Sequence, residues 1–187
     1  MLDAGIDVPE KRVFISIQEA DKWFHGAMSQ VLNHFNRQYV KTDEYNPIIE
    51  WLSDNEGLGI AIMGNPGSGK TIITRFVIPY ILHKARNLNV KYFNAIDIKK
   101  SADIKAIYSD NKIIAIDDIG VEEVVSEYGS KIDAFPEIMD RVEKDNKLLI
   151  INTNLDQESF KKRYGVRAYD RLKSCLKPVV LTNKSFR

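Results

Sequence analysis

The sequence predicts an α/β fold with a parallel sheet, and two stretches carry this prediction. In the first, the short apolar run 58–63 is followed directly by the glycine-rich stretch 64–71. In the second, the apolar run 113–116 ends in the paired carboxylates of Asp117 and Asp118. Runs of this length are typical of buried strands, and the carboxyl ends of parallel strands face the crevice where ligands bind. The 187 residues fit one such domain with a small extension.

The composition excludes several classes of protein. A net charge of +1 predicts no bulk attraction to nucleic acid or membranes, so any such site would be a local patch. The single cysteine, Cys175, excludes an internal disulfide framework, and we interpret it as a packed residue in a reducing compartment. No run reaches the roughly 18 apolar residues that span a bilayer, and the first residues lack a signal-peptide core. We therefore expect a cytoplasmic protein with no membrane partner.

Residues 1–44 are predicted to form a helical extension of the main domain. The first 16 residues are an extended lead-in, and Val13, Ile15 and Ile17 alternate weakly, as in a short strand. From residue 17 to residue 40, apolar residues recur every three or four positions, which predicts a helix with one apolar face. This aromatic-rich face either packs on the domain or docks on a partner protein. We interpret His25 and His34 as structural or surface groups.

Turn signals and apolar runs predict the other elements of the domain, residues 45–187. Asn46 is expected to cap a helix that starts at Pro47 and reaches residue 53. Pro79 is expected to kink or end the helix that follows the glycine-rich stretch. Further strands are expected at 90–93, 147–151 and 177–182, and further helices at 97–108, within the acidic stretch 122–145, and at 157–164.

The glycine-rich stretch matches the pattern G-x-x-x-x-G-K-[ST], which is typical of a phosphate-binding loop. The matching residues are Gly64, Asn65, Pro66, Gly67, Ser68, Gly69, Lys70 and Thr71. The glycines let backbone N–H groups turn inward around a polyphosphate. Lys70 can reach the β and γ phosphates, and the Thr71 hydroxyl can hold Mg²⁺. The helix that begins around Ile72 points its positive end at the anion. ATP and Mg²⁺ are therefore the predicted cofactors.

Polar side chains at two other strand ends are candidates for the chemistry. Asp117 is expected to hold Mg²⁺ through its water shell. Asp118 is placed to polarise an attacking water as a general base. The predicted strand 147–151 ends in Asn152-Thr153-Asn154, and a polar amide at this end could orient that water or contact the γ-phosphate.

The main basic cluster of the sequence, residues 161–173, has two readings. In one, it contacts phosphate, either in a neighbour's ATP or in a nucleic-acid backbone. In the other, it is an exposed amphipathic helix with Val166, Tyr169 and Leu172 facing inward.

The order of these motifs resembles the AAA+ ATPases of the DnaC/IstB group, which are helicase loaders and transposition helper ATPases. The resemblance covers residues 45–187, and its discriminating part is the segment Tyr164-Gly165-x-Arg167-x-x-x-Arg171-Leu172. It implies a three-layer P-loop NTPase fold of the AAA+ type, with a parallel five-stranded sheet of order 5-1-4-3-2 and no separate helical lid.

The same resemblance implies roles for individual residues. Asp117 would be the metal residue, Asp118 would occupy the place of the catalytic acid, and Asn154 would be the sensor of the γ-phosphate. Arg171, with Arg167 as the second candidate, resembles an arginine finger that enters the ATP site of an adjacent subunit. Many AAA+ proteins carry Glu where this chain has Asp118, so slow hydrolysis is expected.

The resemblance therefore implies an ATP-dependent homo-oligomer that acts in DNA replication as a helicase loader-like factor. Its expected partners are a replicative helicase or a transposase, and single-stranded DNA. The alternatives are a transposition helper ATPase, a nucleotide-dependent scaffold that does not hydrolyse ATP, and a small-molecule phosphotransferase. Turnover separates the scaffold from the ATPases, and a phosphorylated product would identify the phosphotransferase.

Overall fold

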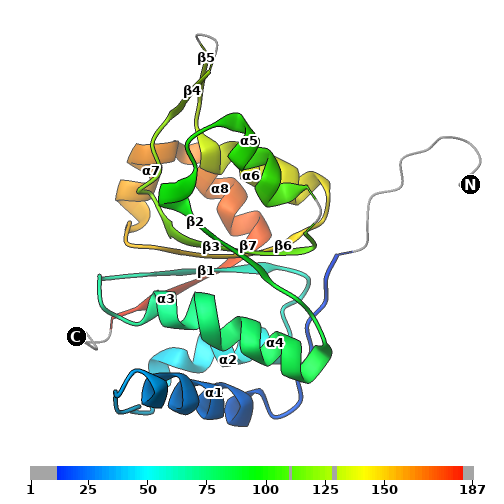
Figure 1. Cartoon of the computed structure of the whole chain (residues 1–187), viewed down its shortest axis with the longest axis vertical. Coiled ribbons are helices and arrows are strands. Elements are labelled where there is room, and N and C mark those ends of the chain that lie inside the picture. The colour runs from blue at the N-terminus through cyan, green and yellow to red at the C-terminus, as the bar shows by residue number, and fades with distance from the viewer. Residues whose placement is uncertain (1–11, 110, 128–129, 183–187) are drawn as a thin grey trace, which may run out of the picture.

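The computed structural model of the protein describes residues 12–109, 111–127 and 130–182 (Figure 1). Their main feature is a parallel sheet of five strands. In spatial order these are β2 (Lys91–Asn94), β3 (Ile113–Ile119), β6 (Leu148–Thr153), β1 (Gly59–Gly64) and β7 (Leu176–Leu181). Counted along the chain within this sheet alone, the order is 2-3-4-1-5, which reads 5-1-4-3-2 from the other edge, as predicted. The labels β4 and β5 belong to a separate hairpin.

Helices cover both faces of the sheet, which confirms the three layers (Figure 1). One face carries α1 (Ala20–His34), α2 (Asn46–Ser53) and α4 (Ile78–Arg86), and the other carries α5 (Ser101–Tyr108), α6 (Ala134–Lys144), α7 (Gln157–Tyr164) and α8 (Val166–Cys175). Successive side chains of a strand point to opposite faces. In β1, accordingly, Ile60 and Ile62 join the core under α1, whereas Ala61 and Met63 join the core under α6. The three central strands, β3, β6 and β1, are thus buried on both sides, as their apolar residues predict.

The helix after the glycine-rich stretch is continuous but irregular. α3 (Lys70–Ile72) runs into a π-helical turn, η3 (Ile73–Val77), which runs into α4 with Pro79 near its start. Proline has no N–H to donate, and its ring clashes with the carbonyl four residues earlier. The wider π turn directly before Pro79 accommodates this clash. The helix therefore does not end at the proline but changes its hydrogen-bond register there.

The helix expected over residues 17–40 is shorter than predicted and occupies only α1. Its end is a turn in which Asn36 takes a left-handed conformation with φ 54°. The N–H of Arg37 then donates to the carbonyl of Leu32 at 2.9 Å. Left-handed residues of this kind commonly terminate helices, and asparagine tolerates them well. The apolar periodicity alone does not show where this turn interrupts the helix.

Two local expectations near the N-terminus are wrong. The segment around Val13 is extended but belongs to neither sheet, and the N–H of Ile15 donates instead to the side chain of Asn55 at 2.7 Å. Asn46 is the first residue of α2 rather than its cap. Tyr45 occupies the cap position of α2 and makes no side-chain cap bond, whereas Thr42 accepts a backbone N–H at the start of the preceding 3₁₀ turn, η2 (Asp43–Tyr45). Similarly, the helix expected at 97–108 is divided into a 3₁₀ turn, η4 (Ala95–Asp97), and α5.

A hairpin formed by β4 (Val125–Glu127) and β5 (Ser130–Ile132) follows β3 and stands out at the top of Figure 1. The sequence analysis assigned this acidic stretch to a helix, but α6 begins only at Ala134. Valine favours strands because its branched Cβ packs well on a pleated surface, and Val125 pairs with Ile132. The predicted buried side of α6 is confirmed for Phe135, Ile138, Met139 and Val142.

Candidate functional site

The phosphate-binding pattern forms a tight loop between β1 and α3. Gly64 ends β1 with φ 145°, and a Cβ on it would lie 2.1 Å from the carbonyl oxygen of Leu181 in β7, so only glycine fits there. Gly67 and Gly69 also have positive φ values, of 89° and 88°. Only glycine adopts such angles without strain. The sequence pattern therefore encodes a loop whose backbone can curl around an anion, as predicted for these residues.

Lys70 lies at the centre of this loop and is only 4% exposed. Its ammonium group donates to the carbonyl oxygens of Gly64 at 2.8 Å and Asn65 at 2.9 Å, and to the side-chain oxygen of Asn154 at 2.8 Å. Burial lowers the pKa of Lys70, while the nearby carboxylates of Asp118 and Asp117 oppose this shift. The lysine thus joins the phosphate loop to the residue predicted as the γ-phosphate sensor.

A β-bulge separates the two carboxylates at the end of β3. Ile116 pairs with Ile151, but the next pair is Ile119 with Thr153, so β3 has one residue more than β6 between these points. Bulges redirect side chains and are frequent beside active sites. Here the bulge leaves Asp117 3% exposed inside the protein and brings Asp118 to the pocket.

Asn152 of β6 holds this bulge in place. Its side-chain oxygen accepts the N–H of Asp118 at 2.9 Å, and its amide donates to one carboxylate oxygen of Asp117. The other oxygen of Asp117 accepts the hydroxyl of Tyr92 at 3.1 Å. Burial and the Asp117 carboxylate raise the pKa of Tyr92 to about 12. Sequence reasoning missed Tyr92 and the contact of Asn152 with Asp117, because these residues lie on strands that neighbour β3 rather than near Asp117 in the sequence.

Asp118 has the properties required of a proton acceptor. It has a left-handed backbone with φ 57°, and its carboxylate accepts the amide of Asn154 at 3.3 Å. Burial and the Asp117 carboxylate raise its pKa, whereas Lys70 and the Asn154 amide act in the opposite direction. A general base works best when its pKa lies closer to the operating pH than that of a free aspartate.

The phosphate loop and the ends of β3 and β6 surround a pocket of about 680 Å³. Its lining residues come from the phosphate loop, the helix after it, two strand ends and the N-terminal region: Arg37, Pro66, Gly67, Gly69, Lys70, Thr71, Ile72, Asp118 and Asn154. Of the predicted loop residues, Asn65 contributes its carbonyl to Lys70, and Ser68 is fully buried behind the loop. Arg37 was not predicted, because nothing in the local sequence connects it to the loop.

The residues predicted to hold magnesium, Thr71 and Asp117, supply oxygen groups of the kind that this ion prefers. Thr71 lines the pocket, whereas Asp117, the residue before Asp118 in the chain, is buried and is not among the lining residues. Mg²⁺ is usually held by one or two protein oxygens together with phosphate and water. Within the described ranges, no group of three or more His, Cys, Asp or Glu residues could hold a metal by itself.

The two predicted arginine fingers lie away from this pocket. Arg171, on α8, bonds to Asp140 on α6, and its Nε lies 3.0 Å from a carboxylate oxygen of Glu143. Arg167 is exposed on the first turn of α8. Neither of them lines the pocket of its own chain.

The rest of the basic cluster combines surface charge with packing. Tyr169 and Leu172 are buried as the amphipathic-helix reading expected, but Val166 is 59% exposed. Lys161 and Lys173 lie over the Tyr169 ring, at 4.9 and 5.1 Å from its centre. Arg163 instead holds the base of the hairpin, through Asp133 at 3.0 Å.

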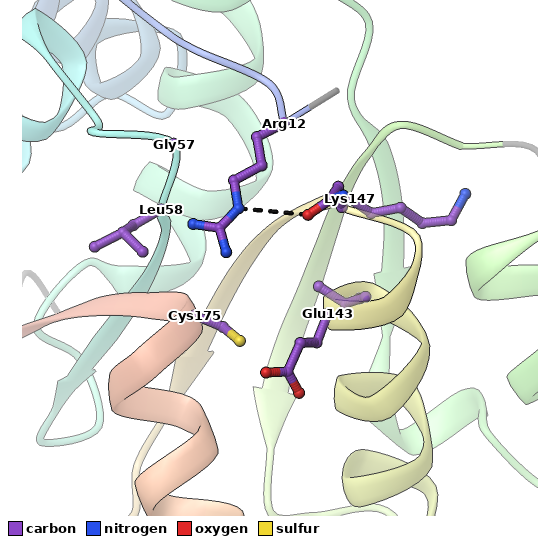
Figure 2. Close-up of a pocket in the computed structure, with 8 residues that line it drawn as sticks. Arg12, Gly57, Leu58, Glu143, Lys147 and Cys175 are labelled. Atoms are coloured by element: carbon purple, nitrogen blue, oxygen red, sulfur yellow. Dashed lines mark hydrogen bonds between the residues drawn. The ribbon is translucent and has the colours of Figure 1, made fainter. Parts of the chain in front are cut away.

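A smaller hollow of about 290 Å³ contains the single cysteine (Figure 2). Cys175 lies there with Glu143 and Arg12, and Arg12 donates to the side chain of Asn146 at 3.4 Å. Burial raises the pKa of the Cys175 thiol. A thiol with a raised pKa is a poor nucleophile at neutral pH, which agrees with its interpretation as a packed residue.

A family model described as Novel STAND NTPase 3 matches residues 39–177, well over half of the chain. The chain belongs to this family of NTPases. The matched region includes the phosphate loop, the bulge of β3 and the end of β6, so the family assignment covers every residue that lines the pocket except Arg37.

Comparison with solved structures shows the fold of this chain. The DnaC helicase loader superposes with a TM-score of 0.60 at 17% identity, over 78% of this chain and 94% of that chain. DnaA from Aquifex aeolicus, bound to AMPPCP, gives 0.51 at 19% identity, over 78% and 50%. These likenesses confirm the predicted fold, that of the AAA+ P-loop ATPases with the DnaC loader among them.

A curated relative extends the similarity to the sequence. The ORC1-type DNA replication protein 2 of Thermoplasma acidophilum is 34% identical over 115 residues, which are 61% of this chain and 26% of that protein. The chain thus spans about a quarter of the length of this relative. In the part of the chain that the structure describes, we find no helix with the length and apolar character to cross a membrane.

Proposed function

We propose that this protein binds Mg²⁺-ATP in the pocket at the phosphate loop and hydrolyses it slowly. The observation that carries the proposal is the contact of Lys70 with Asn154, because it joins the phosphate loop to the strand ends that bear the carboxylates. Nucleotide binding agrees with the NTPase family and with the AAA+ fold.

In this proposal each pocket residue has a defined task. Backbone N–H groups of residues 64–71 and the Lys70 ammonium bind the phosphates. Thr71 and Asp117 would hold Mg²⁺, which would supply positive charge to offset that of the phosphates. Asp118 accepts a proton from the attacking water as its oxygen bonds to the γ-phosphorus. The bond from this phosphorus to the bridging oxygen breaks, which yields ADP and inorganic phosphate. Asn154 orients the water or the γ-phosphate.

We further propose that the active form is a homo-oligomer with an arginine finger in trans. Arg171 does not line the pocket of its own chain, which agrees with a role at the pocket of a neighbour. Its present partners, Asp140 and Glu143, are exposed carboxylates. Exposed ion pairs of this kind contribute little stability, so assembly could replace them by a phosphate contact. Arg167 remains the second candidate because it is exposed on the same helix.

The biological role that we propose is that of a helicase loader-like factor in DNA replication. It is supported by the fold shared with the DnaC loader and by the similarity to an ORC1-type replication protein. Its partners would be a replicative helicase or a transposase, and single-stranded DNA, which would place the protein in the cytoplasm. Transposition helper, non-hydrolysing scaffold and phosphotransferase are the competing functions, and measured turnover and its products distinguish them.

The first experiment measures ATP hydrolysis with and without single-stranded DNA. We expect slow turnover that DNA increases, a loss of ATP binding in Lys70→Ala, and a loss of turnover with retained binding in Arg171→Ala. Lys84→Ala is the matched control, because Lys84 is exposed on α4 and does not line the pocket. ATP binding without turnover under every condition would instead favour the scaffold, and DNA-independent transfer of phosphate to a small molecule would favour the phosphotransferase.

A further inference from the structure

The pocket contains one residue from outside the nucleotide-binding motifs, namely Arg37. It lies between α1 and η2, in the N-terminal region, whereas all other lining residues belong to the phosphate loop, the helix after it or the strand ends. Its side chain is exposed, and no hydrogen bond or ion pair of its guanidinium is found among the described residues. It also precedes the region 39–177 that matches the family model.

The backbone at Arg37 is held by the end of α1. The N–H of Asn36 donates to Asn33 at 3.0 Å, and that of Arg37 donates to Leu32 at 2.9 Å. Together with the left-handed conformation of Asn36, these bonds form a defined helix ending. The direction in which the chain leaves α1 is therefore fixed.

Aromatic contacts anchor the segment on both sides of Arg37. The Phe35 ring lies 5.7 Å from the ring of Phe76, in the π turn behind the phosphate loop. On the other side, the Tyr39 hydroxyl bonds to Nδ1 of His25 on α1, and its ring packs at 5.7 Å from the imidazole. Because both neighbours are anchored, Arg37 is held at the pocket rather than carried on a free loop.

The charges around the pocket indicate what Arg37 could bind. The ammonium group of Lys70 already faces the carboxylates of Asp117 and Asp118, and its hydrogen bonds go to protein oxygens. Arg37 is a second cation at the same pocket without such a partner. A guanidinium binds phosphate through two parallel hydrogen bonds and also stacks on aromatic rings. Both features occur in a nucleotide.

We propose that Arg37 contacts the bound nucleotide directly, so that the N-terminal extension completes the ATP site. This inference rests on the proposed function, because it requires ATP to bind at the phosphate loop. In this arrangement Tyr39 is a positioning residue, which holds the segment through His25. Nucleotide binding would then also restrain the segment between α1 and η2.

The test is equilibrium binding of ATP and of inorganic tripolyphosphate to the full chain. We expect Arg37→Ala to raise the Kd for ATP about tenfold, the size of a typical charge-assisted contact, and Arg37→Lys to recover part of the loss. Gln38→Ala is the matched control, since Gln38 is the exposed neighbour that does not line the pocket. Thermal melting checks that every variant folds.

Comparing the loss of affinity for ATP with that for tripolyphosphate shows which part of the nucleotide Arg37 contacts. An equal loss for ATP and tripolyphosphate places the guanidinium on the phosphates, and a loss for ATP alone places it on the base or ribose. A Kd for Arg37→Ala equal to that of wild type, for both ligands, overturns the inference. If the wild-type chain itself binds no ATP, the proposed function fails instead, and Lys70→Ala provides the reference for lost binding.

Hydrogen exchange gives a second readout that does not depend on affinity. In the wild type, saturating ATP should slow exchange at residues 36–42, and Arg37→Ala should lose this effect even at ATP concentrations that saturate it. Tyr39→Phe should weaken the effect, while exchange within α1 stays unchanged. Equal slowing in wild type and Arg37→Ala would contradict a direct contact.

Discussion

At the residue scale, the end of β3 sets both the backbone and the charge of Asp118. The bulge places this residue in a left-handed conformation, which a non-glycine residue seldom adopts, and Asn152 holds it there. The same position brings Asp118 beside Asp117, and burial together with that carboxylate raises its pKa. Backbone strain at a carboxylate beside a phosphate loop is characteristic of a site kept for its chemistry.

The substitution Asp118→Asn tests this role. Asparagine tolerates a left-handed backbone but cannot accept the proton of an attacking water, so ATP should still bind while turnover falls by 100-fold or more, about the contribution of a general base. Equilibrium binding should give a Kd for ATP near the wild-type value, and single-turnover rates measure the loss of hydrolysis. Turnover of the variant at the wild-type rate would exclude Asp118 as the base.

The raised pKa of Asp118 also predicts two pH effects. Only the ionised carboxylate accepts a proton, so wild-type turnover should fall with decreasing pH at a higher pH than for a free aspartate, whose pKa is 3.8. A folded-state pKa above the unfolded value means that this group contributes stability at low pH and loses it as the pH rises through the folded pKa. At pH 7, Asp118→Asn should therefore melt no lower than wild type.

Tyr92 predicts a different phenotype, because it acts on the metal carboxylate. Its hydroxyl donates to Asp117, and with a pKa of about 12 it remains a donor throughout the neutral range. Tyr92→Phe should raise the Mg²⁺ concentration for half-maximal turnover several-fold, as expected for the loss of one hydrogen bond to a charged group. Tyr80→Phe, on exposed α4 surface, is the control. An unchanged Mg²⁺ dependence would contradict a role of Tyr92 in holding Asp117.

At the scale of elements, the sequence predicted the parts whose signal is local. The central strands β1, β3 and β6 are largely apolar runs, and the phosphate loop is determined by the angles that only glycine adopts at positions such as Gly64. The hairpin β4–β5 and the end of α1 escaped prediction, because cross-strand pairing and the turn at Asn36 decide them. The contacts of Tyr92 and Asn152 with Asp117 escaped for the same reason, since only the order of the strands brings these residues together.

The packing of α7 on α6 provides a stability prediction at this scale. Phe160 of α7 is fully buried, and its ring meets that of Phe135 of α6 edge to face at 5.4 Å. Phe160→Ala should lower the free energy of unfolding by about 3–5 kcal/mol, as large cavities in cores do. Val166→Ala, at a 59% exposed position of α8, should change it by less than about 0.5 kcal/mol. Urea unfolding measures both, and similar values for the two variants would contradict this packing.

At the scale of the whole molecule, the candidate catalytic groups and the candidate arginine fingers lie on different surfaces of the chain. The pocket lies at the carboxyl ends of β1, β3 and β6, while Arg171 pairs with α6 on the outer helical layer. A complete site, as proposed, therefore needs two subunits that each contribute one part. The prediction that follows concerns mixtures of variants, in which the parts come from different chains.

Lys70→Ala has a defective pocket but an intact Arg171, and Arg171→Ala has the reverse. Each alone should lose ATP turnover, the second by about 10³-fold if Arg171 acts as an arginine finger. An equimolar mixture should regain part of the wild-type turnover, because the pocket of one chain then receives the arginine of the other. Mixing Arg171→Ala with the double variant Lys70→Ala, Arg171→Ala should restore nothing. If the first mixture also stays inactive while Lys70→Ala mixed with Arg167→Ala recovers, Arg167 is the finger. If neither mixture recovers, the arginines do not act between subunits.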